Sequence, residues 1–498
     1  MAWKLLPIKL PPGMFQNGTN YQGAGRWVNG NLVRFHEKIL RPIGGWVRAL
    51  SSSDVTGVCR AGASWKLNDG GRRLAFGSHL GLFGWNGGTL SDITPSGYAD
   101  GRISTVQGFG YGSAIYGDEE YGTQRTTGTA LAATTWSVDL WGDHLVAVAS
   151  HEGIIYEWAG AGATPAAAVA NAPTAGAIFV TSERILMALA AGGDSRRIEW
   201  SDSEDNTEWT PATTNQAGDY NVPTNGLLMS GVKLTGGQTI ILTTSDAWVQ
   251  SYLGPPWIYG HEKIGSDCGV VGKLAHVEFD QRLAWMGRNQ FWMYDGTVQA
   301  IPCEVSDYVF GNLNEDAIEK VHTAHIPRFN EIWWFFPTGS GADEECSDYV
   351  IYNYKEGTWV TGLMARSCWI DDNGVWGCPI GVKSSGEVYE HENGWTDDGG
   401  TREVYVQSGP VEVAGGARTL WVNQIIPDES SRGEVQLQLY SRLSPNGDVT
   451  SHGPYIIGSD YVDTRLQGRS VALRVVEVAQ EDWRWGVPRL NAQAGSGR

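Results

Sequence analysis

Apolar and polar residues alternate in short runs along most of the chain, and the runs end at turns rich in glycine, asparagine or aspartate. Residues 73–94 read RLAFGSHLGLFGWNGGTLSDIT: an apolar strand, a polar turn, a second strand ending in an aromatic residue, and a Trp-Asn-Gly-Gly turn. Alternation with a period of two predicts half-buried antiparallel strands. The pattern therefore favours hairpins over helices.

This hairpin unit recurs along the chain. Further clear copies lie at residues 141–158, 279–296, 330–359 and 375–395, and weaker copies at 178–200 and 239–253. A lone hairpin is unstable, but units spaced by roughly 40 to 60 residues can stack and bury both faces. The recurrence predicts a β-propeller over residues 51–400, with one antiparallel sheet per blade. A β-sandwich is the alternative arrangement of the same strands.

The two ends of the chain differ from this middle part. Residues 1–50 are rich in turns and scattered arginines, and predict an extended N-terminal arm with one or two strands. From residue 401 onward the alternation is more regular, as in VQLQLYSRL and RSVALRVVEVA, and predicts a separate antiparallel β domain over residues 401–498. The best helical pattern spans residues 306–322, where Ser306 and Asn314 are candidate N-caps of two short helices. The predicted fold is all-β with very little helix.

Composition supports this prediction. Glycine accounts for 66 of the 498 residues and tryptophan for 23. Glycine supplies the positive φ angles of tight turns, and aromatic residues favour strands. In a helix interior, glycine costs about 1 kcal/mol relative to alanine. The six cysteines are scattered without a CxxC pair, which favours reduced thiols.

Charge is unevenly distributed. The net charge is −19, yet residues 1–73 hold 11 Lys+Arg against 3 Asp+Glu, a charge of +8, which leaves −27 for the rest. This asymmetry suggests a basic docking segment attached to an acidic body, with ordinary solubility as the alternative explanation. An acidic body repels phosphates, so it does not favour nucleic-acid binding.

Candidate catalytic and metal-binding motifs are weak. No HExxH, GxSxG, P-loop or dinucleotide-binding fingerprint occurs in a suitable context. His322 and His325 lie near Asp316 and Glu319, but a solvated helix surface explains this cluster more simply than a metal site. The glycine-rich run at 108–117 favours a flexible loop, because no helix follows to bind phosphate. We predict no catalytic residue, no metal site and no cofactor.

One segment supports a rival function. Residues 203–209, SEDNTEW, approach the Asp box of sialidase propellers, with Asn in place of Gly and an extra residue before Trp. A carbohydrate-binding or sialidase-like tail propeller that engages host glycans is therefore the alternative. Such an enzyme needs paired carboxylates across a cleft, and for sialic acid an arginine cluster. Nothing in the sequence indicates either, so we predict that the chain is not an enzyme.

Membrane insertion and secretion are not predicted. Lysines and prolines interrupt the first 13 residues, which excludes a typical signal peptide. Pro165 and Pro173 interrupt the Ala/Gly-rich stretch at 159–180, which excludes a membrane helix there.

Several segments together resemble one protein family. GRWVNGNLVRF…KILRPIGGW at 25–46 is similar to the opening of tail nozzle proteins, or packaged-DNA stabilisation proteins, of short-tailed bacteriophages. The blocks at 198–256, 269–296, 304–337 and 465–498 resemble later parts of the same family, in the same order and over nearly the whole chain. The chain departs from the family in lacking an obvious fibre or receptor-binding extension.

The resemblance implies a homo-hexameric ring in the virion tail, assembled in the host cytoplasm. Its partners would be the phage adaptor (the head-to-tail connector) above and needle, plug or tail fibre proteins below. Packaged DNA would pass through the channel without sequence-specific binding. The basic first segment would clamp an acidic neighbour. Candidate interface residues are Arg26, Arg34, Arg41 and Arg48, together with Trp483, Arg484 and Arg489 near the end of the chain.

Overall fold

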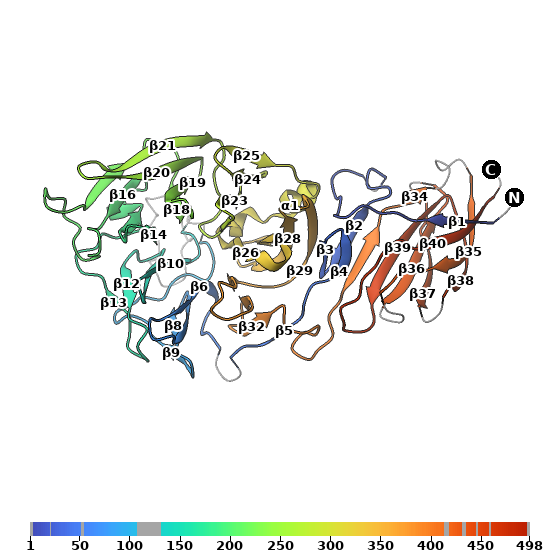
Figure 1. Cartoon of the computed structure of the whole chain (residues 1–498), viewed down its shortest axis with the longest axis horizontal. Helices are drawn as coiled ribbons and strands as arrows, with labels where there is room; N and C mark the ends of the chain where they lie inside the picture. The colour runs from blue at the N-terminus through green and yellow to red at the C-terminus, as the bar shows by residue number, and fades with distance from the viewer. Residues whose placement is uncertain are drawn as a thin grey trace, which may run out of the picture.

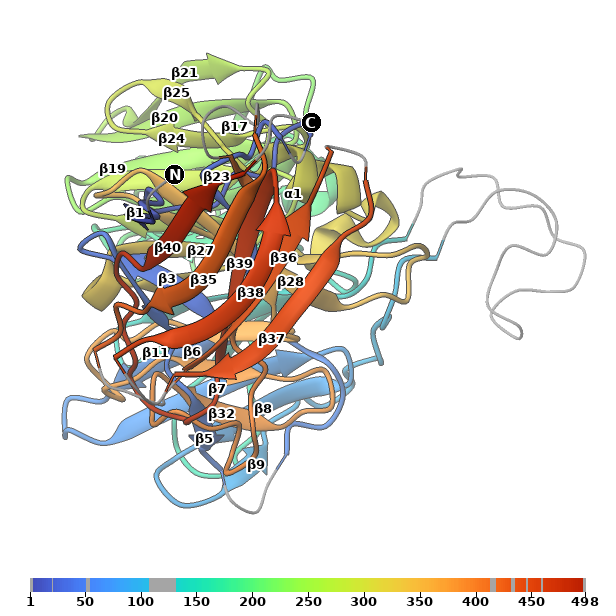
Figure 2. The same ribbon diagram turned by 90° about the vertical axis from the view of Figure 1, so that its right-hand side faces the viewer.

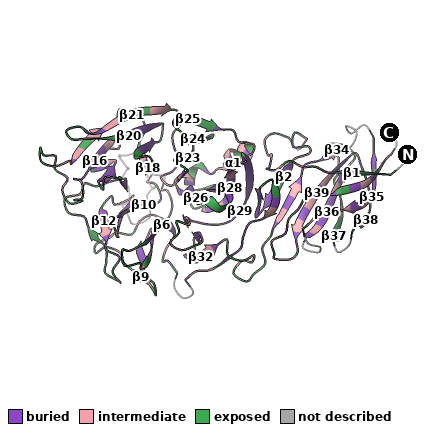
Figure 3. Cartoon of the chain, viewed as in Figure 1, coloured by how far each residue is buried: buried purple, intermediate pink, exposed green. Residues whose placement is uncertain are grey.

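The computed structural model describes residues 3–19, 21–50, 54–106, 131–412, 418–430, 435–444, 447–457 and 460–495. The glycine-rich run at 108–117 lies outside this part of the chain. Two β domains lie side by side along the long axis, and both chain ends lie at the smaller one (Figure 1). Buried residues follow the strands of both domains (Figure 3).

The larger domain is a ring of seven four-stranded antiparallel sheets, counted over the described residues. The first three are β6 (Cys59–Lys66), β7 (Arg72–Ser78), β8 (Gly81–Trp85), β9 (Leu90–Asp92); β10 (Trp136–Trp141), β11 (His144–Ala149), β12 (Ile155–Trp158), β13 (Ala167–Ala168); and β14 (Ala177–Val180), β15 (Leu186–Leu189), β16 (Arg197–Trp200), β17 (Gly218–Asn221). The next three are β18 (Leu228–Lys233), β19 (Gln238–Thr243), β20 (Asp246–Gly254), β21 (Ile258–Ser266); β22 (His276–Phe279), β23 (Arg282–Met286), β24 (Phe291–Tyr294), β25 (Val298–Ile301); and β26 (His322–Ile326), β27 (Glu331–Pro337), β28 (Cys346–Asn353), β29 (Thr358–Leu363). The domain is a β-propeller, which confirms the predicted fold class.

The seventh blade takes its fourth strand from the beginning of the chain. Its sheet order is β30 (Cys368–Ile370), β31 (Ile380–Val382), β32 (Val388–His391) and β5 (Trp46–Arg48). Trp46 pairs with His391, and Arg48 with Tyr389. Two segments that are far apart in the sequence thus close the ring. Because β5 supplies the fourth strand, the last blade is complete and its β32 edge is paired.

The smaller domain is a sandwich of two sheets (Figure 2). One sheet has the order β1 (Lys4–Pro7), β40 (Arg489–Ala494), β35 (Leu420–Ile426), β38 (Val462–Gly468). The other has the order β2 (Trp27–Asn31), β33 (Tyr405–Ser408), β39 (Ser470–Glu477), β36 (Val435–Arg442), β37 (Thr450–Ile456), and β34 (Val411–Glu412) also pairs with β39. β36 and β39 cover the two regular strands predicted after residue 401, and alternate residues of each face the interior.

Residues 1–50 contribute strands to both domains. β1 and β2 belong to the sandwich, β5 belongs to the propeller, and the hairpin of β3 (Val33–His36) and β4 (Ile39–Pro42) lies between the domains (Figure 1). This segment therefore ties the two domains together.

Helix is confined to short segments of the described chain. α1 (Ser306–Asn312) and the 3-10 helix η2 (Glu315–Lys320) confirm the two short helices predicted at 306–322, and two further 3-10 turns are η1 (Ala191–Gly193) and η3 (Pro327–Phe329). Asn314 caps η2, because its side chain accepts a hydrogen bond from the Asp316 N–H. Ser306 is not the cap of α1; that position is held by Val305, which has no side-chain cap bond.

Aromatic side chains of one blade pack against glycines of the next. The Trp136 indole of β10 donates to the Ser78 carbonyl at 2.7 Å and lies over Gly77 of β7, where an added Cβ would approach the ring to 2.4 Å. Phe179 of β14 lies in the same way over Gly231 of β18. Because these contacts need both a large ring and a missing side chain, they explain the joint excess of tryptophan and glycine.

Candidate functional site

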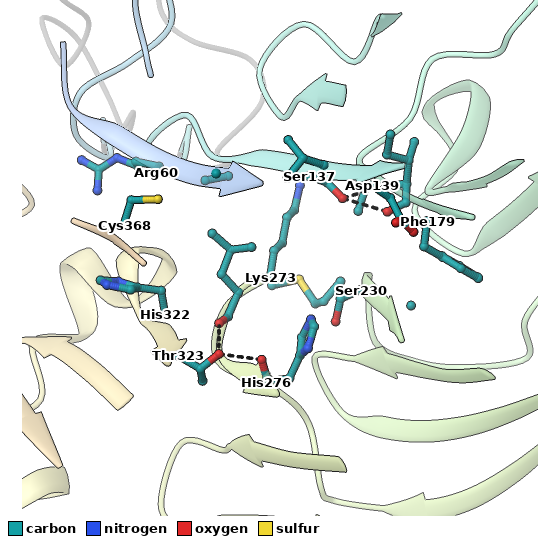
Figure 4. Close-up of a pocket in the computed structure, with 18 of the residues that line it drawn as sticks. Arg60, Ser137, Asp139, Phe179, Ser230, Lys273, His276, His322, Thr323 and Cys368 are labelled. Atoms are coloured by element: carbon teal, nitrogen blue, oxygen red, sulfur yellow. Dashed lines mark hydrogen bonds between the residues drawn. The ribbon is translucent and has the colours of Figure 1, made fainter. Parts of the chain in front are cut away.

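A cavity of about 370 Å³ lies on the axis of the propeller, where strands of all seven blades meet. Residues of β6, β10, β14, β18, β22, β26 and β30 line it (Figure 4). Pockets that bind small molecules have volumes of about 300–1,000 Å³, so this cavity is near the lower end of that range. A DNA duplex is much larger in cross-section, since its major groove alone is about 12 Å wide. The cavity is therefore too small to be a passage for DNA.

The cations that line the cavity differ in their partners. The Lys273 ammonium donates to the Gly176 carbonyl at 2.5 Å, and burial lowers its pKa to about 8. The Arg60 guanidinium is held by Glu345 at 2.7 Å and by the Ile103 carbonyl at 2.8 Å. Lys273 is thus a charged group at neutral pH that a carbonyl, rather than a carboxylate, stabilises.

Two histidines of the cavity are neutral. Burial lowers the pKa of both His276 and His322 to about 4. The His322 Nε2 and the Ser230 Oγ are buried and have no hydrogen-bond partner among the residues that the structure describes. These atoms make the cavity polar, which suits water or a small polar molecule.

Asp139 and Asp371 supply the carboxylates of the cavity wall. Asp139 accepts from the Val180 N–H at 2.7 Å, and Asp371 from the His325 N–H at 2.7 Å. Burial raises the pKa of Asp371 to about 7. Arg60 is the single arginine among the described lining residues, so the arginine cluster expected of a sialic-acid site is not present in this part of the chain.

The raised pKa of Asp371 predicts a pH-dependent stability. The protonated carboxyl is favoured in the folded state, so its contribution is fully present below about pH 4 and is lost as the pH rises through about 7. Asp371→Asn keeps an acceptor for the His325 N–H and removes the charge. We expect it to raise the free energy of unfolding by about 1–2 kcal/mol at pH 8 and to leave it unchanged at pH 4. Urea unfolding at both pH values measures this. The control is Asp343→Asn, because Asp343 is exposed in the turn between β27 and β28; an equal effect of Asp371→Asn at both pH values would contradict the prediction.

The segment that resembles an Asp box forms a turn between β16 and β17. Asp205 accepts from the Thr207 N–H at 2.9 Å and from its hydroxyl at 2.6 Å. The buried Trp209 indole donates to the Asn206 carbonyl at 2.8 Å. These groups hold the turn itself, so the motif is structural.

Three of the four predicted interface arginines form ion pairs at the surface of their own chain. Arg26 binds Glu304 at 2.5 Å and Arg41 binds Asp482 at 2.7 Å. Arg48 binds Asp54, and also Glu387 at 3.1 Å. These three arginines thus have acidic partners in their own chain, and their role at an interface with a neighbouring protein stays a prediction.

Arg34 lies in the interior, with 1% of its side chain exposed. Its guanidinium lies 2.6 Å from Glu392 and 3.1 Å from Glu331, and stacks 3.8 Å from the centre of the Phe329 ring. Burial opposes the charge, but the two carboxylates outweigh it, and the pKa of Arg34 is raised. No second protein can reach this side chain, so it holds β3 against the propeller instead.

The three predicted interface residues near the end of the chain also differ in their exposure to solvent. Trp483 is fully buried, and its indole donates to Glu477 at 3.1 Å. Arg484 is half exposed and lies 3.7 Å from Asp482, and Arg489 is exposed on β40. Trp483 is thus a core residue of the sandwich, and the interface role remains a prediction for Arg484 and Arg489.

The two domains differ in charge. Residues 51–400, which form almost all of the propeller, hold 19 Lys+Arg against 43 Asp+Glu, a net charge of −24. Residues 1–50 and 401–498 together hold 17 against 12, a net charge of +5. The acidic character thus belongs to the propeller alone.

The predicted His322/His325 cluster and the rest of the described chain hold no metal site. Among the described residues, no group of three His, Cys, Asp or Glu is placed to hold a metal ion. Glu319, one member of the predicted cluster, instead accepts hydrogen bonds from Thr105 and from the Ala133 N–H. None of the described helices has the length and apolar character needed to span a membrane.

Similarity to known proteins is limited to solved structures of low sequence identity. No protein-family model and no curated protein matches the chain. Among solved structures, it is similar to virginiamycin B lyase from Staphylococcus aureus, with a TM-score of 0.42 and 9% identity, over 70% of this chain and 97% of that one. It is also similar to YCF48 from Cyanidioschyzon merolae (TM-score 0.37, 8% identity, 70% of this chain and 98% of that one). A third is PorZ of Porphyromonas gingivalis (TM-score 0.39, 11% identity, 83% and 58%).

Proposed function

We propose that this chain is a structural virion protein, the subunit of the tail nozzle of a short-tailed phage. In this role several copies surround a channel, retain packaged DNA and release it, without catalytic turnover. The proposal combines two observations. Segments along nearly the whole chain resemble the tail nozzle family in the same order, and the propeller segment has one property that suits this role. That property, which carries the proposal, is the charge of −24 on the propeller segment.

An acidic wall suits a channel through which DNA must slide. Phosphates are repelled by fixed negative charge, and the repulsion is strongest where the two surfaces are confined. The axial cavity of one propeller is too small for a duplex. The channel must therefore be formed between copies, with the propellers facing the DNA.

A body whose two domains are joined by one segment of the chain also suits a tube wall. Residues 1–50 join both domains through β1, β2 and β5, and the buried Arg34 fixes this segment to Glu331 and Glu392 of the propeller. Pressure from packaged DNA would act on a unit whose two halves are bonded to each other. The adaptor above and the needle or plug below would contact opposite ends of this unit.

Imaging and a binding assay test the proposal. We expect negative-stain images of the purified protein to show a ring of six with a central hole. Fluorescence anisotropy should show no binding of duplex DNA even at about 50 mM salt, where electrostatic binding is strong. A persistent monomer whose melting temperature rises with a glycan would instead support a carbohydrate-binding propeller.

A further inference from the structure

An exposed apolar tip stands at the end of the β20–β21 hairpin. Both strands have nine residues. Leu253 is the penultimate residue of β20, and the turn between the strands holds Pro255, Pro256 and Trp257. The exposed fractions of Leu253 and Trp257 are 60% and 78%. The Trp257 N–H donates a hydrogen bond to the Gly254 carbonyl at 3.1 Å, which closes the turn. The backbone is thus fixed while the indole points into solvent, a costly arrangement unless a partner covers it.

A hollow of about 300 Å³ lies on the sandwich. Its wall includes Val28, Pro410, Tyr440, Val449 and Ala472, from β2, β36, β39 and adjoining turns. It shares Val28 and Gln407 with a second hollow that reaches Asp307 and Tyr308 of α1 in the propeller. We name the first hollow the sandwich groove. Its volume is at the lower limit of about 300 Å³ for ligand pockets, which suits one large side chain.

The tip and the sandwich groove cannot meet within one molecule. β20 and β21 lie on the part of the propeller away from the sandwich (Figure 1). An exposed apolar group that complements a hollow elsewhere on the same surface creates a head-to-tail contact between copies. Such contacts form a closed ring when the rotation between copies closes.

Charge favours a second copy as the occupant. The tip belongs to the segment with a net charge of −24, and the sandwich groove to the segments with a net charge of +5. Arg442 lines the groove, and Arg474 lies on the same outward face of the sheet, over the Tyr405 ring at 3.8 Å. Glu262 and Lys263 are both exposed in the middle of β21, so the negative charge is a property of the whole propeller segment and not of the tip itself. Docking therefore brings an acidic domain onto a basic one, and Trp and Arg are the residue types enriched at interface centres.

We propose that Trp257 of one copy docks in the sandwich groove of a second copy. The contact deepens the proposed function, since it names the surfaces that join neighbouring subunits. It requires that each subunit present its tip to one neighbour and its groove to the other.

Sedimentation velocity over a dilution series tests this contact. We expect the wild-type protein to associate, and Trp257→Ala to weaken association at least about tenfold. Ala472→Trp, which fills the groove, should do the same, and equal circular dichroism and melting curves would show that both variants fold. Trp421→Ala is the matched control, because Trp421 is an exposed tryptophan on the other sheet of the sandwich; it should associate like the wild type.

Cysteine trapping locates the contact. A Trp257→Cys variant mixed with a Val449→Cys variant should form a disulfide-linked dimer when glutathione disulfide is added, and either variant alone should not. Association of Trp257→Ala at the wild-type concentration would overturn the inference while leaving a nozzle ring possible through other surfaces. A wild-type protein that stays monomeric at every concentration would overturn both the inference and the proposed function.

Discussion

Arg34→Met is expected to lower the free energy of unfolding by about 3–5 kcal/mol. Methionine has a similar length, so packing is largely kept, but Glu331 and Glu392 lose their shared cation. Glu331 is 1% exposed and cannot regain solvent. A buried carboxylate without a partner carries the full cost of desolvation, which is why removing one member of a buried pair is more damaging than replacing both.

Urea unfolding of the variant measures this loss. Arg184→Met is the matched control, because Arg184 lies 2.9 Å from Glu204 in an exposed pair. Surface pairs contribute about 0–1 kcal/mol, so the control should lose no more than that. Adding Glu331→Gln to Arg34→Met should recover part of the loss, since it removes one stranded charge. Equal small losses for Arg34→Met and Arg184→Met would show that the buried ion cluster does not hold the N-terminal segment.

The repeating part of the fold could be predicted because its pattern is local. All seven hairpin units recognised in the sequence lie in different blades, and the five clear units match the second and third strands of their blades. Alternation, a turn and a terminal aromatic residue are all contained within about 20 residues, so a single segment indicates its own structure.

The cavity could not be predicted from the same units. It is lined by the first strand of each blade, such as β6, β22 and β30, which precede the recognised patterns. Each blade contributes only a few lining residues. The strands that carry them are also short: β22 has four residues and β30 has three. Lys273 and His276 carry no motif, and only closure of the ring brings them into the same cavity as Asp139 and Asp371.

The excess of basic residues near the beginning of the chain predicted a segment that clamps an acidic neighbour, but it did not predict the acidic partners within the same chain. Arg34 meets Glu331 and Glu392, which lie 297 and 358 residues later, because β3 packs between the two domains. The sequence contains the charge imbalance, but the choice between the same chain and a neighbouring chain depends on tertiary packing. The strand β5 was missed for a related reason: three residues are too few for a period-two pattern, and its pairing with β32 is non-local.

Trp46→Ala is expected to have the second large effect, because Trp46 fastens the strand that completes the seventh blade. Its side chain is 5% exposed, and its indole donates to Asp397. The ring lies 5.3 Å from that of His391, and the Arg366 guanidinium lies 4.9 Å above it. Removing a buried tryptophan costs about 3–5 kcal/mol through lost contacts and the cavity that remains.

The loss should be concentrated at the closure of the ring. Amide hydrogen exchange is expected to accelerate first in β5 and β32, since the sheet edge opens there before the propeller unfolds. Trp3→Ala is the matched control from the same N-terminal segment: Trp3 is 44% exposed, and its replacement should change the free energy of unfolding by about 0.5 kcal/mol or less. If both variants unfolded at the same urea concentration as the wild type, or if exchange in β32 stayed unchanged in Trp46→Ala, β5 would be an accessory strand. A large, localised effect would mean that the propeller, and any channel wall built from it, depends on the first 50 residues for its closure.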